Sequence, residues 1–167
     1  MSSSDGDWRQ RFLFEYANVR GELIRLDQAL LALLARRTYP PVIARQLGEA
    51  MAAAGLLSST LKFDGSLILQ VRGDGSLQTL VASATHDRDL RAVARLRDGA
   101  DEAGLSGTTR MRSLGDLAGS GYLAITLDPD DGGERYQGIV SLTPGSLAET
   151  IETYFEQSEQ LPTRLWL

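Results

Sequence analysis

The chain has 167 residues, of which 43% are hydrophobic and 23% charged, and its formal net charge is −5. These values indicate one globular domain of ordinary size, and the acidic balance argues against the basic surface that nucleic-acid binding requires. The chain has no cysteine and one histidine, His86, which excludes disulfides, thiolate zinc sites, cysteine nucleophiles and sites with two imidazoles within it. No apolar run approaches the roughly 20 residues of a membrane span, so we expect a cytoplasmic protein with neither nucleic acid nor membrane as partner.

The N-terminal region combines a polar tail with short ordered elements. Residues 1–8 are polar and acidic and predict a disordered tail, followed by a single compact domain over residues 9–167. Apolar residues at 11–15 and 19–26 predict two short strands. Asp27 follows the second strand and is expected to cap a helix over residues 28–37.

A long amphipathic helix is predicted from Pro41 to about Leu61. A proline is tolerated in the first turn of a helix, because its missing N–H would be unpaired there. The small residues at 50–55 would let another element approach closely, so we expect this helix at the centre of the core. Its apolar stripe recurs every three or four positions and consists of Ile43, Leu47, Ala50, Ala54, Leu57 and Leu61.

The middle of the chain shows the alternation of β-strands. Gly-Asp-Gly at 73–75 predicts a turn between strands at 66–72 and 77–84. The pattern of residues 87–96 fits either a strand or a helix. Residues 98–121 are rich in Gly, Ser, Thr and Asp, and most of them are expected to form an exposed, variable connection.

The C-terminal part combines a hairpin with a helix. Strands at 122–127 and 134–142 are predicted to pair across an Asp- and Gly-rich loop. Ser146 and Glu149 have the spacing of a capping box, which predicts a helix beginning there, and residues 161–167 are expected to be extended. Strand pairs interrupted by helices predict an α+β fold, in which antiparallel or mixed sheets pack with helices in a single compact domain.

Four carboxylates lie close together between residues 128 and 134, which invites comparison with calcium-binding loops. A calcium loop beginning at Asp128 would need an oxygen ligand in place of Gly132 and a bidentate glutamate in place of Ile139. Both ligands are missing, so a hairpin turn built by Pro, Asp and Gly is the favoured interpretation. We predict no metal site in this loop.

His86 and Asp87 are the best candidates for an acid–base pair, but neighbours in a strand point to opposite faces. The sequence has neither a Gly-x-Ser-x-Gly elbow nor a glycine-rich phosphate loop. We therefore expect no catalytic residue, no nucleotide and no other cofactor in this chain. A carboxylate-dependent hydrolase remains an alternative, and it would require the carboxylates of residues 128–134 to meet His86 in a pocket.

Aromatic and aliphatic residues gather near the C-terminal end. Packing within the core is one interpretation, and a contact with a second subunit or another protein is the other, because aromatic side chains are favoured in buried interfaces. Trp166 lies in the extended terminal segment and fits ordinary core packing least well. The candidate dimer or client contacts are Tyr136, Tyr154, Phe155, Leu161, Leu165 and Trp166.

An ordered series of short motifs resembles one protein family, the redox-regulated bacterial holdase chaperones called heat shock protein 33. The most specific motifs are DPDDGGERYQGIV at 128–140 and SEQLPTRL at 158–165. Others precede them in the same order as in the family, and the resemblance favours a strand over residues 87–96. These earlier motifs are VRGE at 19–22, YPP at 39–41, LLSSTLKF at 56–63, GDG at 73–75 and LAIT at 123–126.

The resemblance implies an ATP-independent holdase, not an enzyme, that binds unfolding proteins under oxidative stress and acts as a homodimer. In this family four cysteines of a C-terminal segment bind zinc, and their oxidation exposes client-binding surface. Those cysteines would lie beyond Leu167, so we expect either an N-terminal core without its redox switch or a natural cysteine-free relative. A non-catalytic dimeric interaction module is the alternative function.

Overall fold

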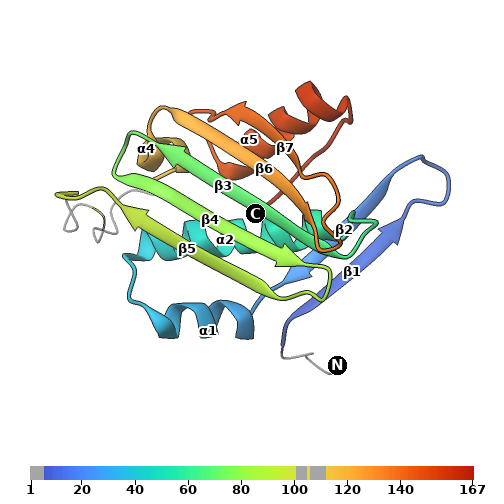
Figure 1. Ribbon diagram of the computed structural model, residues 1–167, viewed down its shortest axis with the longest axis horizontal. Coiled ribbons are helices and arrows are strands. Elements are labelled where there is room, and N and C mark those ends of the chain that lie inside the picture. Colours follow the sequence, from blue (N-terminus) through green and yellow to red (C-terminus); the bar gives the residue numbers. More distant parts are fainter. Residues whose placement is uncertain (1–5, 101–104, 106–111) are drawn as a thin grey trace.

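A five-stranded antiparallel sheet forms the centre of the computed structural model, which describes residues 6–100, 105 and 112–167 (Figure 1). Helices pack against it, so the predicted α+β class is confirmed. The two predicted hairpins and the strand interpretation of residues 87–96 are confirmed as well. Across the sheet the strands lie in the order β5 (Leu90–Leu96), β4 (Leu77–Thr85), β3 (Gly65–Gly73), β6 (Gly121–Pro129) and β7 (Tyr136–Ser141).

Helices pack against one face of the sheet and beside one of its edges. They are α1 (Gln28–Arg36), α2 (Pro41–Ser58), α4 (Leu114–Ala118) and α5 (Leu147–Tyr154), and a π-helical turn, η1 (Phe155–Glu159), continues α5. In Figure 1, α2 and α5 lie behind the sheet, α1 runs beside β5, and α4 sits near the ends of β3 and β4. None of the helices in the described part of the chain has both the length and the apolar content needed to cross a membrane.

The core lies between the sheet and α2. Because side chains alternate along a strand, Leu67, Leu69 and Val71 of β3 share one face, and all three are buried. Ile43 and Leu47 of the predicted α2 stripe are fully buried in the same cluster, and burying each such side chain contributes about 1.5–3 kcal/mol. The central position predicted for α2 is therefore confirmed.

The small residues of α2 allow another strand to approach closely. A Cβ atom placed on Gly55 would lie 2.6 Å from Cδ1 of Ile24, so a larger residue would push this strand away. Ile24 belongs to β2 (Arg20–Arg25), which pairs with β1 (Trp8–Leu13) as a two-stranded antiparallel sheet. The close approach predicted from residues 50–55 is thus confirmed, and it fixes the base of this hairpin on α2.

The N-terminal cap of α1 comes from a distant residue and not from the one predicted. Asp27 occupies the cap position but its side chain makes no capping hydrogen bond. Instead, the carboxylate of Asp7 accepts hydrogen bonds from the backbone N–H groups of Asp27, Gln28 and Ala29. The prediction of Asp27 as the cap is wrong, and residues 7 and 8 of the expected tail are ordered, since β1 begins at Trp8.

The connection predicted over residues 98–121 contains a helix. Ser113 and Asp116 form a capping box at the start of α4, and Leu114 and Leu117 are buried in the core. The expectation of an exposed connection is wrong for this part, because two leucines three positions apart give the short helix an apolar side. Residues 101–104 and 106–111 lie outside the described residues.

The capping box predicted for α5 is confirmed. The Ser146 hydroxyl accepts a hydrogen bond from the Glu149 backbone N–H at 3.2 Å, and the Glu149 carboxylate accepts one from the Ser146 N–H at 2.7 Å. After η1, residues 161–167 have no regular secondary structure.

Candidate interaction surfaces

Tyr154, a predicted contact residue, belongs to the core. It is only 3% exposed, and its hydroxyl donates a hydrogen bond to Oε1 of Glu159 at 2.8 Å. The Tyr136 hydroxyl lies 3.4 Å away, and burial, followed by these hydrogen bonds, raises the pKa of Tyr154 above its ordinary value. As placed, Tyr154 joins α5, β7 and η1, and it is not available to a partner. Tyr136, at the edge of this group, remains exposed.

Of the remaining residues predicted as contacts, some pack against the core and others are exposed. Phe155 and Leu165 pack against the core. Leu161 and Trp166 are exposed, and Trp166 is 83% exposed. Glu152 holds this terminal segment beside α5, because its carboxylate accepts a hydrogen bond from the Leu165 N–H at 2.7 Å and pairs with Arg164 at 2.9 Å. The end of the chain therefore presents two apolar side chains on a fixed segment.

A larger apolar surface lies on the β1–β2 hairpin, residues 8–25, which we call the arm. Figure 1 shows it projecting away from the sheet, and every residue of β1 is exposed. Leu13 and Tyr16, at its far end, are 75% and 95% exposed. A patch of this kind marks an interaction site in soluble proteins, since exposed apolar side chains normally occur singly. The large apolar residues exposed along the arm are Trp8, Phe12, Leu13, Phe14, Tyr16, Val19 and Leu23.

Sequence reasoning missed the arm as a candidate surface. Its signal is the run Phe12-Leu13-Phe14, which places apolar side chains on both faces of a short strand. This pattern alone favours a strand that is buried on both faces. Only the tertiary structure shows that the body of the protein leaves Phe12, Leu13 and Phe14 exposed.

Two arginines fasten the arm to the body. Arg9 donates a hydrogen bond to the Gly55 carbonyl and Arg11 donates one to the Ser59 carbonyl, each at 2.9 Å. These carbonyls lie at the C-terminal end of α2, where unpaired acceptors and the helix dipole favour cations. Arg11 also pairs with Glu22 across the hairpin at 2.6 Å. The base of the arm is thus held, while its apolar end extends beyond these contacts.

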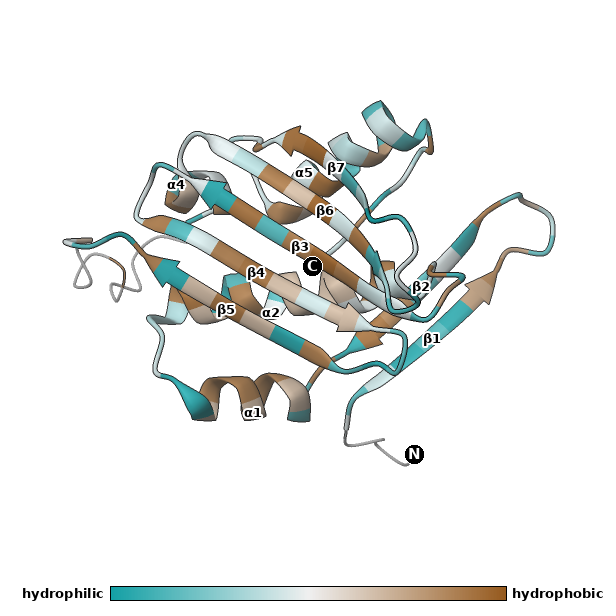
Figure 2. Cartoon of the chain, in the orientation of Figure 1, coloured by the Kyte–Doolittle hydropathy of each residue, from teal (hydrophilic) through white to brown (hydrophobic). Residues whose placement is uncertain are grey.

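The apolar surface on the face of the sheet opposite α2 is less continuous than that on the arm. Val93 and Ile139 on the two outer strands are exposed, but they lie in one cross-strand row with Gln70 between them. In the next row, Gln137 donates a hydrogen bond to the Thr126 hydroxyl at 2.9 Å. Figure 2 shows hydrophilic and hydrophobic residues alternating along these strands. The polar side chains divide this face into small apolar areas.

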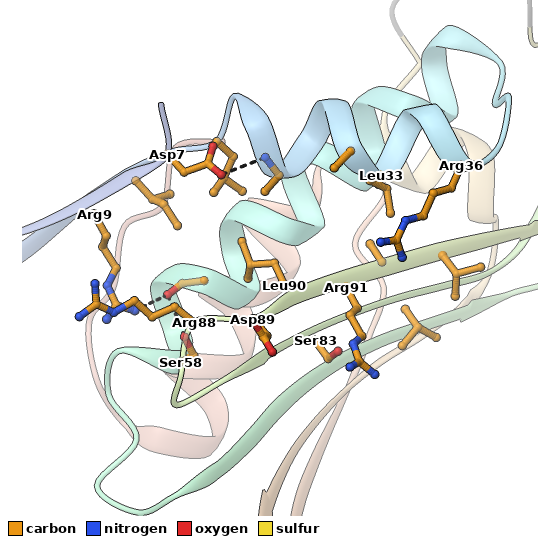
Figure 3. Close-up of a pocket in the computed structure, with 18 of the residues that line it drawn as sticks. Asp7, Arg9, Leu33, Arg36, Ser58, Ser83, Arg88, Asp89, Leu90 and Arg91 are labelled. Atoms are coloured by element: carbon orange, nitrogen blue, oxygen red, sulfur yellow. Dashed lines mark hydrogen bonds between the residues drawn. The ribbon is translucent and has the colours of Figure 1, made fainter. Parts of the chain in front are cut away.

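A groove of about 670 Å³ lies between α1, the base of the arm and β5. Figure 3 shows Leu33 and Arg36 of α1 directed towards it from one side and Leu90 from the other. Apolar side chains line the groove, and arginines stand around it.

His86 lies among carboxylates at one end of the sheet. Nε2 is 3.3 Å from Asp87 and 3.8 Å from Asp64, and Nδ1 is 3.7 Å from Asp130. The prediction that His86 and Asp87 point apart is wrong, because both lie in the turn beyond the end of β4. Nδ1 also accepts a hydrogen bond from the Gly65 N–H at 3.2 Å.

This group does not resemble a hydrolase or metal site. The carboxylates are well exposed and approach different ring nitrogens, so they do not surround a reaction pocket. Within the described residues, no group of three or more potential ligands is arranged to hold a metal ion.

Comparison with known proteins identifies the family. The sequence model of the Hsp33 protein family matches residues 7–167. A 33 kDa chaperonin of Nitrosococcus oceani is 54% identical over 157 residues, which cover 94% of this chain and 51% of the relative. One of Pseudomonas syringae pv. tomato is 47% identical over 163 residues, covering 98% of this chain and 52% of the relative. The chain belongs to the Hsp33 family.

A solved structure supports the fold. The crystal structure of the 33 kDa chaperonin (heat shock protein 33 homolog) of Thermotoga maritima matches with a TM-score of 0.72 at 23% identity, over 87% of this chain and 49% of that one. The chain spans about half the length of the curated relatives that it matches.

Proposed function

We propose that this chain is the client-holding core of an ATP-independent holdase chaperone, and that the apolar end of the arm is its main client contact. The observation that carries the proposal is the exposure of Leu13, Phe14 and Tyr16 on a hairpin that extends from the body. A holdase needs adaptable apolar surface and no catalytic group. Family membership supports the same function.

The energetics predict weak and reversible holding. Each client side chain buried on the arm contributes about 1.5–3 kcal/mol before the cost of ordering is subtracted, so a few contacts give rapid exchange. A two-stranded hairpin is marginally stable by itself, so its outer end can adapt to different clients. The net charge of −5 helps to keep a client complex in solution.

The test is light scattering from a thermally unfolding client to which increasing amounts of the chain are added. We expect partial suppression of aggregation at a one-to-one ratio, most of it lost in the double variant Phe14→Ser/Tyr16→Ser. The matched control is Leu161→Ser/Trp166→Ser, which removes a comparable apolar area at the C-terminal end and is expected to retain suppression. The reverse ranking would transfer the client site to the C-terminal segment. Equal binding of the native client would favour a plain interaction module.

The proposal includes a homodimer in the cytoplasm. Of the contacts predicted from the sequence, Leu161 and Trp166 are exposed on a segment fixed by Glu152, so they can join two copies without rearrangement. A symmetric pair of chains would bury these side chains and leave both arms available.

The zinc-dependent redox switch of the family is proposed to lie outside these 167 residues. Residues of this chain do not fit such a site, because it contains no cysteine and its one histidine is engaged by Gly65 and three carboxylates. The holdase step assigned to the arm therefore involves no metal.

A further inference from the structure

Strand β5 has an unpaired edge. It pairs with β4 on one side, and no strand of the described residues pairs with it on the other. In an antiparallel pair, alternate residues direct their backbone groups towards the partner strand. The Thr85 N–H bonds to the Asp89 carbonyl, whereas the Ala94 N–H bonds to the Tyr39 hydroxyl, outside the sheet. Leu90 and Ala92 share the direction of Ala94, so their backbone groups point to the open edge.

The groove surrounds this edge. It is lined by Leu90 and Ala92, whose side chains point to the helix face of the sheet, and also by Arg91 and Val93, whose side chains point to the other face. Figure 3 shows Leu90 and Arg91 on opposite sides of the strand. The space therefore continues the plane of the sheet, where an additional strand would lie.

The helix on the far side of the groove is incompletely covered. Seven of the nine residues of α1 are alanine or leucine, yet none is buried. Leu30 rests on Gly48 of α2, while Leu33 faces the groove. Figure 2 shows α1 as one of the most hydrophobic helices on the outside of the molecule. A strand inserted beside β5 would bury this apolar side.

The charge of the groove is opposite to that of the whole chain. Arg36, Arg88 and Arg91 line it, and none of the three forms an ion pair within the described residues. Of its two carboxylates, Asp7 is engaged by the N-terminus of α1, which leaves Asp89. Arg88 has a φ of 72°, a conformation that is costly for a residue other than glycine and is common at functional sites.

We propose that this groove binds an extended polypeptide segment, in which acidic residues alternate with apolar ones, as an additional strand beside β5. The free backbone groups of Leu90 and Ala92 pair with the segment, its apolar side chains pack on α1, and its carboxylates meet the arginines. Tyr39 ends the pairing at Ala94. The choice of an unfolding client as source of the segment rests on the holdase function proposed for the arm. A fatty-acid anion fits the charges but leaves the backbone groups unpaired.

The test uses a short fluorescent peptide that alternates valine and glutamate, titrated with the full chain and followed by anisotropy. Its affinity is expected to fall with rising salt, because part of the attraction is between exposed charges. The same peptide with lysine in place of glutamate is expected to bind at least about tenfold more weakly, as attraction becomes repulsion at several arginines. Equal binding of the two peptides would overturn the assignment.

Two variants separate the contributions of charge and backbone. Arg36→Glu/Arg91→Glu is expected to weaken the glutamate peptide about tenfold, whereas Arg95→Glu, on the same strand beyond the groove, leaves it unchanged. Ala92→Pro removes an N–H that points away from β4, so the β4–β5 ladder remains while the added strand loses a hydrogen bond. Full affinity in Ala92→Pro, or displacement of the peptide by a fatty acid, would overturn the proposal of a paired strand.

Hydrogen exchange supplies a readout that does not depend on any variant. Binding is expected to slow exchange of the outward amides of Leu90 and Ala92, with little change at Arg91 and Val93, which already bond to β4. No added protection at Leu90 and Ala92 contradicts strand addition. Peptide binding here and aggregation suppression by the arm are measured separately, so failure of either proposal is distinguishable from failure of the other.

Discussion

At the level of single residues, Tyr154 shows how one buried hydroxyl joins three elements. Its ring lies over Gly138 of β7, where a Cβ atom would come within 2.4 Å of the ring, and its hydroxyl donates to Glu159 of η1. The glycine in the RYQGIV motif is therefore required by close packing, since no larger residue fits beneath the ring. Tyr154, which the sequence suggested as a contact with a partner, instead holds α5, β7 and η1 together.

The buried hydroxyl predicts an alkaline loss of stability. The pKa of Tyr154 is raised by burial above its ordinary value of 10.0, so above that pH the unfolded chain loses a proton that the folded chain retains. Its contribution to the free energy of unfolding is full below pH 10 and declines as the pH rises further. We expect Tyr154→Phe to flatten this decline and to cost about 0.5–1.5 kcal/mol at neutral pH through the lost hydrogen bond. Urea unfolding at several pH values measures both effects; an equally steep decline in the variant would contradict this assignment.

The cap of α1 gives a second prediction for single residues. Asp7→Ala removes the acceptor of three backbone N–H groups and is expected to destabilise the protein by about 1 kcal/mol, with faster exchange of the Gln28 and Ala29 amides. Asp27→Ala is the matched control, because its side chain makes no capping bond and only a surface pair with Arg25. A larger effect at Asp27 than at Asp7 would restore the cap predicted from the sequence.

At the level of elements, the arm depends on α2 for its orientation. The double variant Arg9→Ala/Arg11→Ala removes the hydrogen bonds to the Gly55 and Ser59 carbonyls. We expect faster amide exchange throughout the arm with little change in the melting temperature, because the core does not include these contacts. Arg20→Ala, on β2 away from α2, serves as the control. Unchanged exchange in the double variant would show that Ile24 packing alone orients the arm.

At the level of the whole molecule, the exposed apolar residues of the C-terminal segment predict self-association. Size exclusion with light scattering is expected to give about twice the mass of one chain, and Leu161→Ser/Trp166→Ser is expected to shift it towards a monomer. The arm variant Phe14→Ser/Tyr16→Ser is the control and should remain dimeric. A dimer lost only in the arm variant would exchange the roles of the two surfaces.

The composition of the chain predicts indifference to oxidation. Without thiols, client protection is expected to be the same in a reductant and in peroxide, and elemental analysis is expected to find no stoichiometric zinc. One zinc ion per chain would contradict this, because a single histidine and exposed carboxylates make a poor tetrahedral site.

The sequence by itself determined most of the strands, the helices α2 and α5 and the buried faces of these elements, but not α4. Alternation at Leu67, Leu69 and Val71, the stripe of α2 and the reciprocal bonds of Ser146 and Glu149 depend on local periodicity and short-range hydrogen bonds. The family motifs are likewise short and contiguous. Features of this kind can be predicted from sequence because side chains return to the same face of a strand every two residues and of a helix every three or four.

Only the tertiary structure decided which apolar residues are exposed to solvent. Tyr154 and Trp166 are both aromatic residues near the C-terminus, yet Tyr154 is buried against β7 and Trp166 is exposed. Trp166 is exposed because Glu152 holds the terminal segment beside α5. The cap of α1 comes from Asp7, twenty residues before the predicted Asp27. The open edge of β5 depends on the order of strands in the sheet. Each of these depends on contacts between distant parts of the chain, which local pattern does not encode.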